Sequence, residues 1–247
     1  MRIRVYNSDD IKLQGLAYYN DCYKYWDLNH CKEAFEQEYP NLIPKINGSF
    51  HNPNLKMAVI KFDEYEHDFK NYYQNLPNKV KRDIKISEKH KFYFKKFNFN
   101  NYLQDFCEIN RSQNERRNVN PWYLNSPEFF KNSHSGYRHE WEDDLHYSQW
   151  YGLFKFLKHY RQGDVITNEK LFAYCKLAVE GELATIHLIW AHNNFLNKGI
   201  MFRLLTSVIE EAMKNKNIKC LVYHAYQQYP TWKSRMLFKP EPIEIIL

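Results

Sequence analysis

The chain has 247 residues, with 35 lysine and arginine residues against 29 aspartate and glutamate residues, for a net charge of +6. Hydrophobic residues make up 44% of it, which excludes wholesale disorder and suffices for one large domain or two small ones. The five cysteines form no CxxC pair, which excludes a typical disulfide framework or zinc knuckle. Without an apolar leader or a run of about 18 apolar residues, the sequence predicts a cytoplasmic protein with no membrane partner, monotopic anchoring aside.

Residues 1–56 are predicted to form an irregular, aromatic-rich N-terminal extension, and residues 57–247 the main domain. The main domain opens with the apolar run Met57–Phe62, which is typical of a short buried strand. A helix is predicted next, because five apolar positions follow with helical spacing: Tyr65, Phe69, Tyr72, Tyr73 and Leu76. Pro77 is expected to end it.

The segment Lys79–Lys96 is the most basic part of the chain, with eight cationic residues against Asp83 and Glu88. Its first half predicts a helix and its second half a strand. One interpretation is a surface that binds phosphates of tRNA, DNA or a cofactor. The other is a solvated face of a lysine-rich protein, since abundant Lys and Asn are typical of an AT-rich coding genome. The modest net charge favours the solvated face.

A further helix is predicted with Asn100 or Asn101 as its cap and with an apolar face of Tyr102, Leu103, Phe106 and Ile109. It leads into the polar run Asn110–Arg117. Residues 125–149 are polar and are expected to form a loop.

From Trp150 onward, apolar and polar residues alternate regularly, as is typical of strands. Strands are predicted over Trp150–Leu157 and Leu171–Val179, around a turn at Gln162–Asp164. The next strand, Leu183–Trp190, alternates between two faces. The buried face is expected to carry Ala184, Ile186, Leu188 and Trp190, and the opposite face Thr185 and His187.

A short loop, His192–Lys198, joins this strand to an amphipathic helix that Gly199 opens, and Ile218–Tyr223 is the next predicted strand. A strand that feeds a helix through a short loop directs backbone N–H groups and the positive end of the helix dipole at one place. Such a place binds an anionic or carbonyl-bearing ligand.

Several blocks of the chain resemble a known family. Leu76–His90 resembles the segment of FemABX-type peptidyltransferases in which a basic helix precedes a strand. Glu108–Arg116, followed by Tyr123, resembles a motif of uncharacterised GNAT-like acyltransferases of bacteria and phages. The C-terminal half resembles the same proteins in these blocks: Trp150–Phe154, Leu171–Tyr174, Ile189–His192, Gly199–Met201 and Phe238–Pro240.

The resemblance implies an α/β (α+β) fold with a GNAT-like central mixed, largely antiparallel sheet flanked by helices. It implies an acyltransferase that moves an acyl or aminoacyl group to an amine or hydroxyl of a small molecule or peptide. The loop before Gly199 lacks the Arg/Gln-x-x-Gly-x-Gly/Ala pattern that holds the pyrophosphate of coenzyme A in ordinary GNAT enzymes. The donor is therefore left open between acyl-CoA, including acetyl-CoA, and aminoacyl-tRNA.

The resemblance also implies roles for single residues. The candidate general bases are Glu108, His187 and His192, and the candidate acids for the leaving group are Tyr223 and Tyr226. Donor binding is expected at the backbone of the strand, in the loop and at the helix start, at Leu188, Ile189, Trp190, Asn193, Asn194, Lys198, Gly199, Ile200 and Arg203. Acceptor binding is expected at Asn110, Ser112, Arg116, Tyr123 and Tyr174.

Each of these predictions has a plainer alternative. A histidine in the middle of a strand, such as His187, is more often a satisfied histidine on a partly exposed sheet face, and the Glu108–Arg116 cluster is equally compatible with a solvated helix end. No metal is expected, because the His, Cys and acidic residues match no ligand spacing. Two other functions stay open. One is a nucleic-acid modification enzyme of the same fold, which acts on tRNA or a phage DNA base and binds the nucleic acid through Lys79–Lys96. The other is a non-catalytic binding module.

Overall fold

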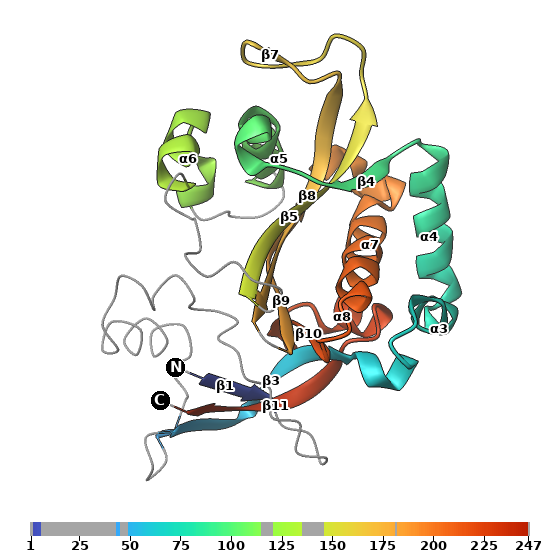
Figure 1. Cartoon of the computed structure of the whole chain (residues 1–247), viewed down its shortest axis with the longest axis vertical. Coiled ribbons are helices and arrows are strands. Elements are labelled where there is room, and N and C mark those ends of the chain that lie inside the picture. The colour runs from blue at the N-terminus through green and yellow to red at the C-terminus, as the bar shows by residue number, and fades with distance from the viewer. Residues whose placement is uncertain are drawn as a thin grey trace.

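The computed structural model describes residues 2–5, 43–44, 49–114, 121–134, 146–180 and 182–246. Its centre is a nine-stranded sheet in the order β1-β11-β3-β10-β9-β8-β5-β4, with β2 paired to β3 (Figure 1). The strands are β1 (Arg2–Val5), β2 (Ile43–Pro44), β3 (Ser49–Lys61), β4 (Tyr93–Lys96), β5 (His146–Phe156), β8 (Glu169–Glu180), β9 (Leu183–Ala191), β10 (Cys220–Ala225) and β11 (Lys239–Ile246). Among the described strands, β9 and β10 are parallel and all other pairs are antiparallel. The predicted mixed, largely antiparallel sheet is confirmed.

Helices cover both faces of this sheet (Figure 1). One face carries α7 (Ile200–Lys214), with α3 (Phe69–Asn75) and α4 (Asn78–Lys89) packed against it. The other face carries α5 (Leu103–Asn114) and, outside it, α6 (Pro127–His134). The remaining elements are short: η1 (Phe62–Tyr65), η2 (Phe99–Tyr102), η3 (Pro121–Leu124), η4 (Asn193–Lys198), α8 (Pro230–Arg235), and a hairpin of β6 (Arg161–Gln162) and β7 (Val165–Ile166).

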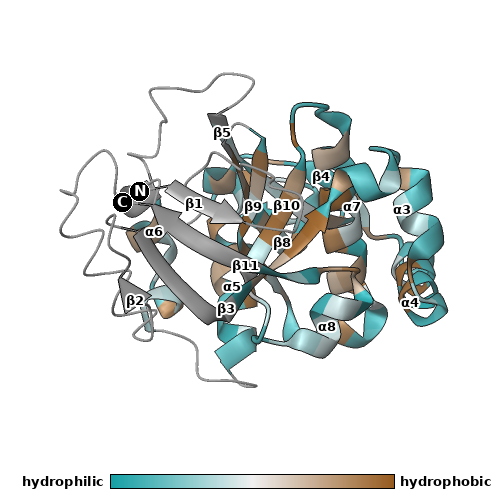
Figure 2. Cartoon of the chain, turned by 90° about the horizontal axis from the view of Figure 1, so that it is seen from below, coloured by the Kyte–Doolittle hydropathy of each residue, from teal (hydrophilic) through white to brown (hydrophobic). Residues whose placement is uncertain are grey.

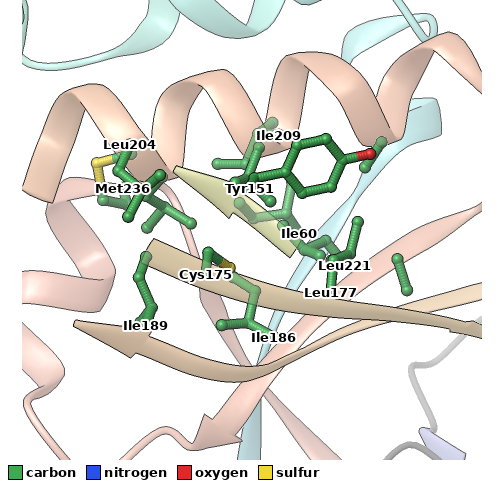
Figure 3. Close-up of a cluster of buried hydrophobic side chains, with 14 of the residues drawn as sticks. Ile60, Tyr151, Cys175, Leu177, Ile186, Ile189, Leu204, Ile209, Leu221 and Met236 are labelled. Carbon is green, nitrogen blue, oxygen red and sulfur yellow. The ribbon is translucent and has the colours of Figure 1, made fainter. Parts of the chain in front are cut away.

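Two hydrophobic cores lie on the two faces. The larger one fills the space between the sheet and α7, where Leu204 and Ile209 of the helix meet Tyr151, Cys175 and other strand residues (Figure 3). The smaller core lies under α5 and is rich in aromatic rings, among them Phe106, Phe154 and Tyr174. The central strands β8, β9 and β10 are accordingly apolar in Figure 2, while the outer helix α3 is hydrophilic.

Most of the predicted elements are confirmed, with shifted ends. The basic run divides into α4 and β4, and α7 begins directly after Gly199. Asn98, rather than Asn100 or Asn101, caps the turn before α5, because its side chain accepts the hydrogen bond of the Asn100 N–H. The prediction of a loop over residues 125–149 is wrong in part, since α6 lies within it and β5 already begins at His146.

The alternation predicted for β9 is wrong beyond its middle. The register between β8 and β9 slips between Lys176 and Leu177, which leaves His187 as an extra residue in β9, a β-bulge. Ala184 and Ile186 face the core under α7, but beyond the bulge Ile189 takes that face. Leu188 and Trp190 turn instead to the aromatic core under α5. A single bulge therefore exchanges the faces of half the strand.

The expected boundary between extension and main domain falls inside β3, which starts at Ser49. Strand β1 precedes it in the chain and pairs with β11 at the other end of the sequence. The domain division itself stays a prediction. Within the described residues no helix is both long and apolar enough to cross a bilayer.

Candidate active site

The parallel pair β9–β10 opens into a fork. The two strands pair over three residues only, the last pair being Val222 with Thr185. Beyond that pair β9 runs on to Ala191 and β10 to Ala225 without pairing to each other. The helix α7 connects the two strands, and its N-terminus lies at the same carboxyl end of the sheet. Ligands of open α/β sheets bind at the carboxyl ends of parallel strands, where the strand order diverges.

A buried lysine lies beside this fork. Lys233 of α8 is 1% exposed, and its Nζ lies 4.7 Å from the ring centre of Tyr223, the first β10 residue beyond the pairing with β9. Burial favours the neutral amine over the ammonium and lowers the pKa of Lys233 to about 8. A lysine with a pKa near the working pH can accept and return a proton. Lys233 is therefore the strongest candidate for acid–base chemistry at the fork.

Sequence reasoning missed Lys233. It stands in the stretch Pro230–Arg235 with another lysine or arginine close by, so nothing local distinguishes it from a solvated cation. The available signal was its apolar neighbours Trp232, Met236 and Phe238, of which Met236 and Phe238 are buried together with Lys233. Tyr223, which was predicted as the acid, does lie at the fork, with its ring against Trp232 and Phe238.

A second group of polar residues joins α5 to the end of β9. The carboxylate of Glu108 lies 3.2 Å from Nε2 of His192 and 2.6 Å from Nζ of Lys170. Nδ1 of His192 accepts the Asn194 N–H at 3.3 Å, so the proton belongs on Nε2, which donates to Glu108. This hydrogen bond and the Lys170 ammonium lower the pKa of Glu108 to about 2.

The contacts of Glu108 and His192 make both residues less suitable as the general base. A carboxylate with a pKa of about 2 is a poor proton acceptor at neutral pH. In His192, both ring nitrogens already have partners. The arrangement suits a positioning role, in which Glu108 fixes the imidazole and the strand end, better than it suits proton abstraction.

The residues predicted to bind the acceptor are brought together, but inside the protein. Asn110 is fully buried, accepts the hydroxyl hydrogen of Tyr174 and donates to the backbone carbonyl of Tyr123 at 2.9 Å. Ser112 accepts the N–H of Asn193 at 3.0 Å. Their polar atoms thus hold α5, η3, β8 and the β9–η4 junction together. Arg116 lies outside the described residues, and acceptor binding by these residues stays a prediction.

The start of α7 is in close contact with α4. Gly199 has a left-handed φ of 71°, and a Cβ built on it would lie 1.9 Å from the Asp83 carbonyl oxygen. Arg203 forms an ion pair with Glu88 at 3.0 Å, which neutralises part of the charge expected to meet a phosphate. Lys198 and Asn193 are half-buried, and Asn194 is exposed. These residues surround the helix N-terminus, and their role in donor binding stays a prediction.

The β-bulge at His187 decides which face of the sheet the remaining predicted site residues of β9 occupy. His187 is the bulged residue itself, Leu188 and Trp190 are half-buried on the α5 face, and Ile189 and Ile200 are in the core under α7. Tyr226, the other candidate acid, follows β10 and donates its backbone N–H to the Lys56 carbonyl. No group of His, Cys, Asp and Glu suited to a metal ion occurs within the described residues.

The fold has counterparts among solved structures. FemX matches over 100% of this chain and 88% of its own, with 10% identity and a TM-score of 0.57. L-PGS from Bacillus licheniformis matches over 86% of this chain, with 9% identity and a TM-score of 0.47, and this chain spans 64% of it. The PaiA N-acetyltransferase from Thermoplasma acidophilum in complex with coenzyme A matches over 63% of this chain and 99% of its own, with 15% identity and a TM-score of 0.40.

The chain has a GNAT-like, FemABX-related fold. No protein-family model and no curated protein matches its sequence. The likeness to FemX is therefore a likeness of the fold. Of the polar residues described above, Lys233 and Tyr223 are the ones that lie beside the fork between β9 and β10.

Proposed function

We propose that the protein is an acyltransferase that works at the fork between β9 and β10, with Lys233 as its general base. The observation that supports this most directly is a buried amine, with a pKa of about 8, beside the point where the two parallel strands separate. Lysine side chains are rarely fully buried, because a buried ammonium loses its hydration.

In the proposed reaction the acceptor amine or hydroxyl attacks the donor carbonyl carbon. A new C–N or C–O bond forms, the acceptor proton passes to the neutral Lys233 amine, and the bond from the carbonyl carbon to the leaving group breaks. The leaving group takes a proton from Tyr223 or, through it, from Lys233. Backbone N–H groups on the edge of β9 beyond Thr185, which β10 no longer pairs, would stabilise the oxyanion.

The donor is an activated acyl group carried by an anionic molecule. The start of α7, with Lys198 and Arg203 near it, offers amide groups and a positive dipole end to a phosphate. Coenzyme A and aminoacyl-tRNA share this chemistry. The outer face of α4, which packs on α7, exposes Lys79, Arg82, Lys85 and Lys89. This cationic stripe favours the larger polyanion, aminoacyl-tRNA, as donor.

The same stripe supports a second candidate, in which nucleic acid is the acceptor and a base of tRNA or DNA is acylated. The four exposed cations recur along one side of α4, opposite the buried Val80 and Ile84, so they present one continuous charged surface. Neutralising Lys79 and Lys85 is expected to weaken tRNA or DNA binding and to reduce its dependence on salt.

Donor identity can be tested by native mass spectrometry of the purified protein, followed by thermal-shift titration with acyl-CoAs and with charged and uncharged tRNA. Stabilisation by one of the two donor classes is expected, and by the acylated form more than by the free carrier. The outcome that would contradict the proposal is no stabilisation by either class. That result would leave the non-catalytic binding module as the better interpretation.

A further inference from the structure

We propose that the hairpin β6–β7, with the strand ends that carry it, is a docking element for a membrane surface rich in anionic phospholipid. The hairpin stands out from the sheet at the end of the molecule opposite the two termini (Figure 1). It lies apart from the fork, so this inference does not depend on the proposed acyl transfer. It revises the sequence-based expectation of no membrane partner.

The hairpin and the strand end at its base carry unusually exposed apolar side chains. Phe156 is 64% exposed, Val165 is 60% exposed and Ile166 is 49% exposed. Val165 and Ile166 are consecutive, and Phe156 is the last residue of β5, the strand that leads into the hairpin. Because consecutive strand residues point to opposite faces, Val165 and Ile166 expose apolar side chains on both faces of the hairpin, and Phe156 adds a third at its base.

The polar residues of the same element are mainly cationic. Between residues 155 and 166 the chain has Lys155, Lys158 and Arg161 against a single acid, Asp164. None of these four forms an ion pair within the described part of the chain, whereas Lys95 and Lys170 nearby are paired to Glu169 and Glu108. Apolar side chains with unpaired cations around them fit the interface of an anionic bilayer, where rings and aliphatic groups enter the acyl boundary and cations meet phosphates.

The base of the hairpin is held rigidly on its α5 side. Tyr160 donates its hydroxyl hydrogen to the buried carboxylate of Asp105 at 2.6 Å. The same carboxylate accepts the Leu171 N–H at 2.8 Å. The Asp105 N–H in turn donates to Gln162 Oε1 at 3.3 Å.

On the β4 side, the carboxylate of Glu169 accepts hydrogen bonds from Tyr93, Tyr102 and Lys95. Fixing the base on both sides means that the tip meets the membrane without first being ordered, which lowers the cost of binding.

Vesicle flotation of the whole protein tests this proposal, with vesicles of phosphatidylcholine alone and of phosphatidylcholine mixed with phosphatidylglycerol. We expect binding to the mixed vesicles that weakens as salt rises, and little binding to phosphatidylcholine. The triple variant F156S/V165S/I166S is expected to bind at least about tenfold more weakly, since the loss of inserted apolar area lowers the affinity. K158Q/R161Q is expected to bind about tenfold more weakly as well.

Matched controls remove equivalent groups elsewhere. F129S removes a 38% exposed ring on α6, and K70Q/K131Q removes two exposed cations on α3 and α6. Both are expected to keep wild-type vesicle binding. The proposal is overturned if the wild type does not bind the mixed vesicles, or if the hairpin variants bind them as well as the controls do. A change in oligomeric state of the triple variant, measured by light scattering with no vesicle binding by the wild type, would assign the tip to contact with a second copy instead.

Discussion

Glu108 and His192 are 84 positions apart in the sequence, and their side chains meet at 3.2 Å where α5 crosses the carboxyl end of β9. Lys170 completes the group from β8, with both Glu108 oxygens 2.6 Å from its Nζ. One carboxylate thus fixes a helix to two strands. The group involves α5, while Lys233 lies next to Tyr223 at the fork.

The Glu108 contacts give a stability prediction with a defined pH window. The pKa of Glu108 is about 2 in the folded protein, below its ordinary value of 4.5, so its ionised form stabilises the fold at neutral pH. Because the side chain is 43% exposed, we expect E108Q to lower the free energy of unfolding by about 1–2 kcal/mol at pH 7.

Denaturant titrations at a series of pH values check this. The stabilisation should be complete above about pH 5 and should disappear as the pH falls toward 2, where the wild type and E108Q converge. E211Q is the control, since Glu211 pairs with Lys214, an exposed residue, and should cost no more than about 0.5 kcal/mol. An E108Q difference that does not vary with pH would contradict the ionic explanation.

Replacing Lys233 should raise the stability of the protein and remove its activity. Its folded pKa of about 8 lies below the ordinary 10.5, so the buried ammonium is a cost at neutral pH. We expect K233M to be more stable than the wild type by about 1–3 kcal/mol at pH 7. The difference should shrink as pH rises from about 8 to 10.5, because the unfolded chain then binds a proton that the folded chain has already released.

Once the acyl donor is identified, the same role of Lys233 predicts how activity depends on pH. The wild-type kcat/KM should rise through about pH 8 as Lys233 loses its proton, and K233M should lack this limb. K233R should also be inactive, because a guanidinium cannot act as a base near neutral pH. Retained activity in K233R would instead indicate that only the positive charge matters.

Gly199 should tolerate no side chain. G199A would place a methyl group 1.9 Å from the Asp83 carbonyl oxygen and force an alanine into a left-handed backbone. We expect a loss of about 3 kcal/mol or more in unfolding free energy, measured by denaturant titration. G163A is the matched control. Gly163 is also left-handed, but its added methyl meets only the Gln104 side chain at 3.3 Å, so about 1 kcal/mol is expected.

The hairpin anchor can be loosened without touching the tip. Y160F removes the donor to the buried Asp105 carboxylate and should cost about 1–3 kcal/mol. Hydrogen exchange should become faster over residues 157–168 and stay unchanged in α7. Y229F, at a tyrosine that is 62% exposed, is expected to alter neither quantity. Equal exchange in Y160F and the wild type would show that the hairpin is held by other contacts.

The sequence by itself determined the elements whose signal is local. The apolar spacing of Ile200 to Met213 predicts α7, and the division of the basic run into a helix and a strand predicts α4 and β4. Both predictions succeed because the spacing of apolar residues within a short segment shows which of them the element buries. The structure also brings Glu108, Asn110, Ser112, Tyr123 and Tyr174 to one side of the sheet around α5, while the roles predicted for them stay predictions.

Only the tertiary structure decided how those residues act. The bulge at His187 depends on the pairing of β8 with β9, and it turned Leu188 and Trp190 away from the face that simple alternation predicts. The Glu108–His192 contact and the burial of Lys233 arise between segments that are distant in the chain, and they set proton positions and pKa values. Electrostatics and desolvation depend on what surrounds a group in space, so no local pattern carries them.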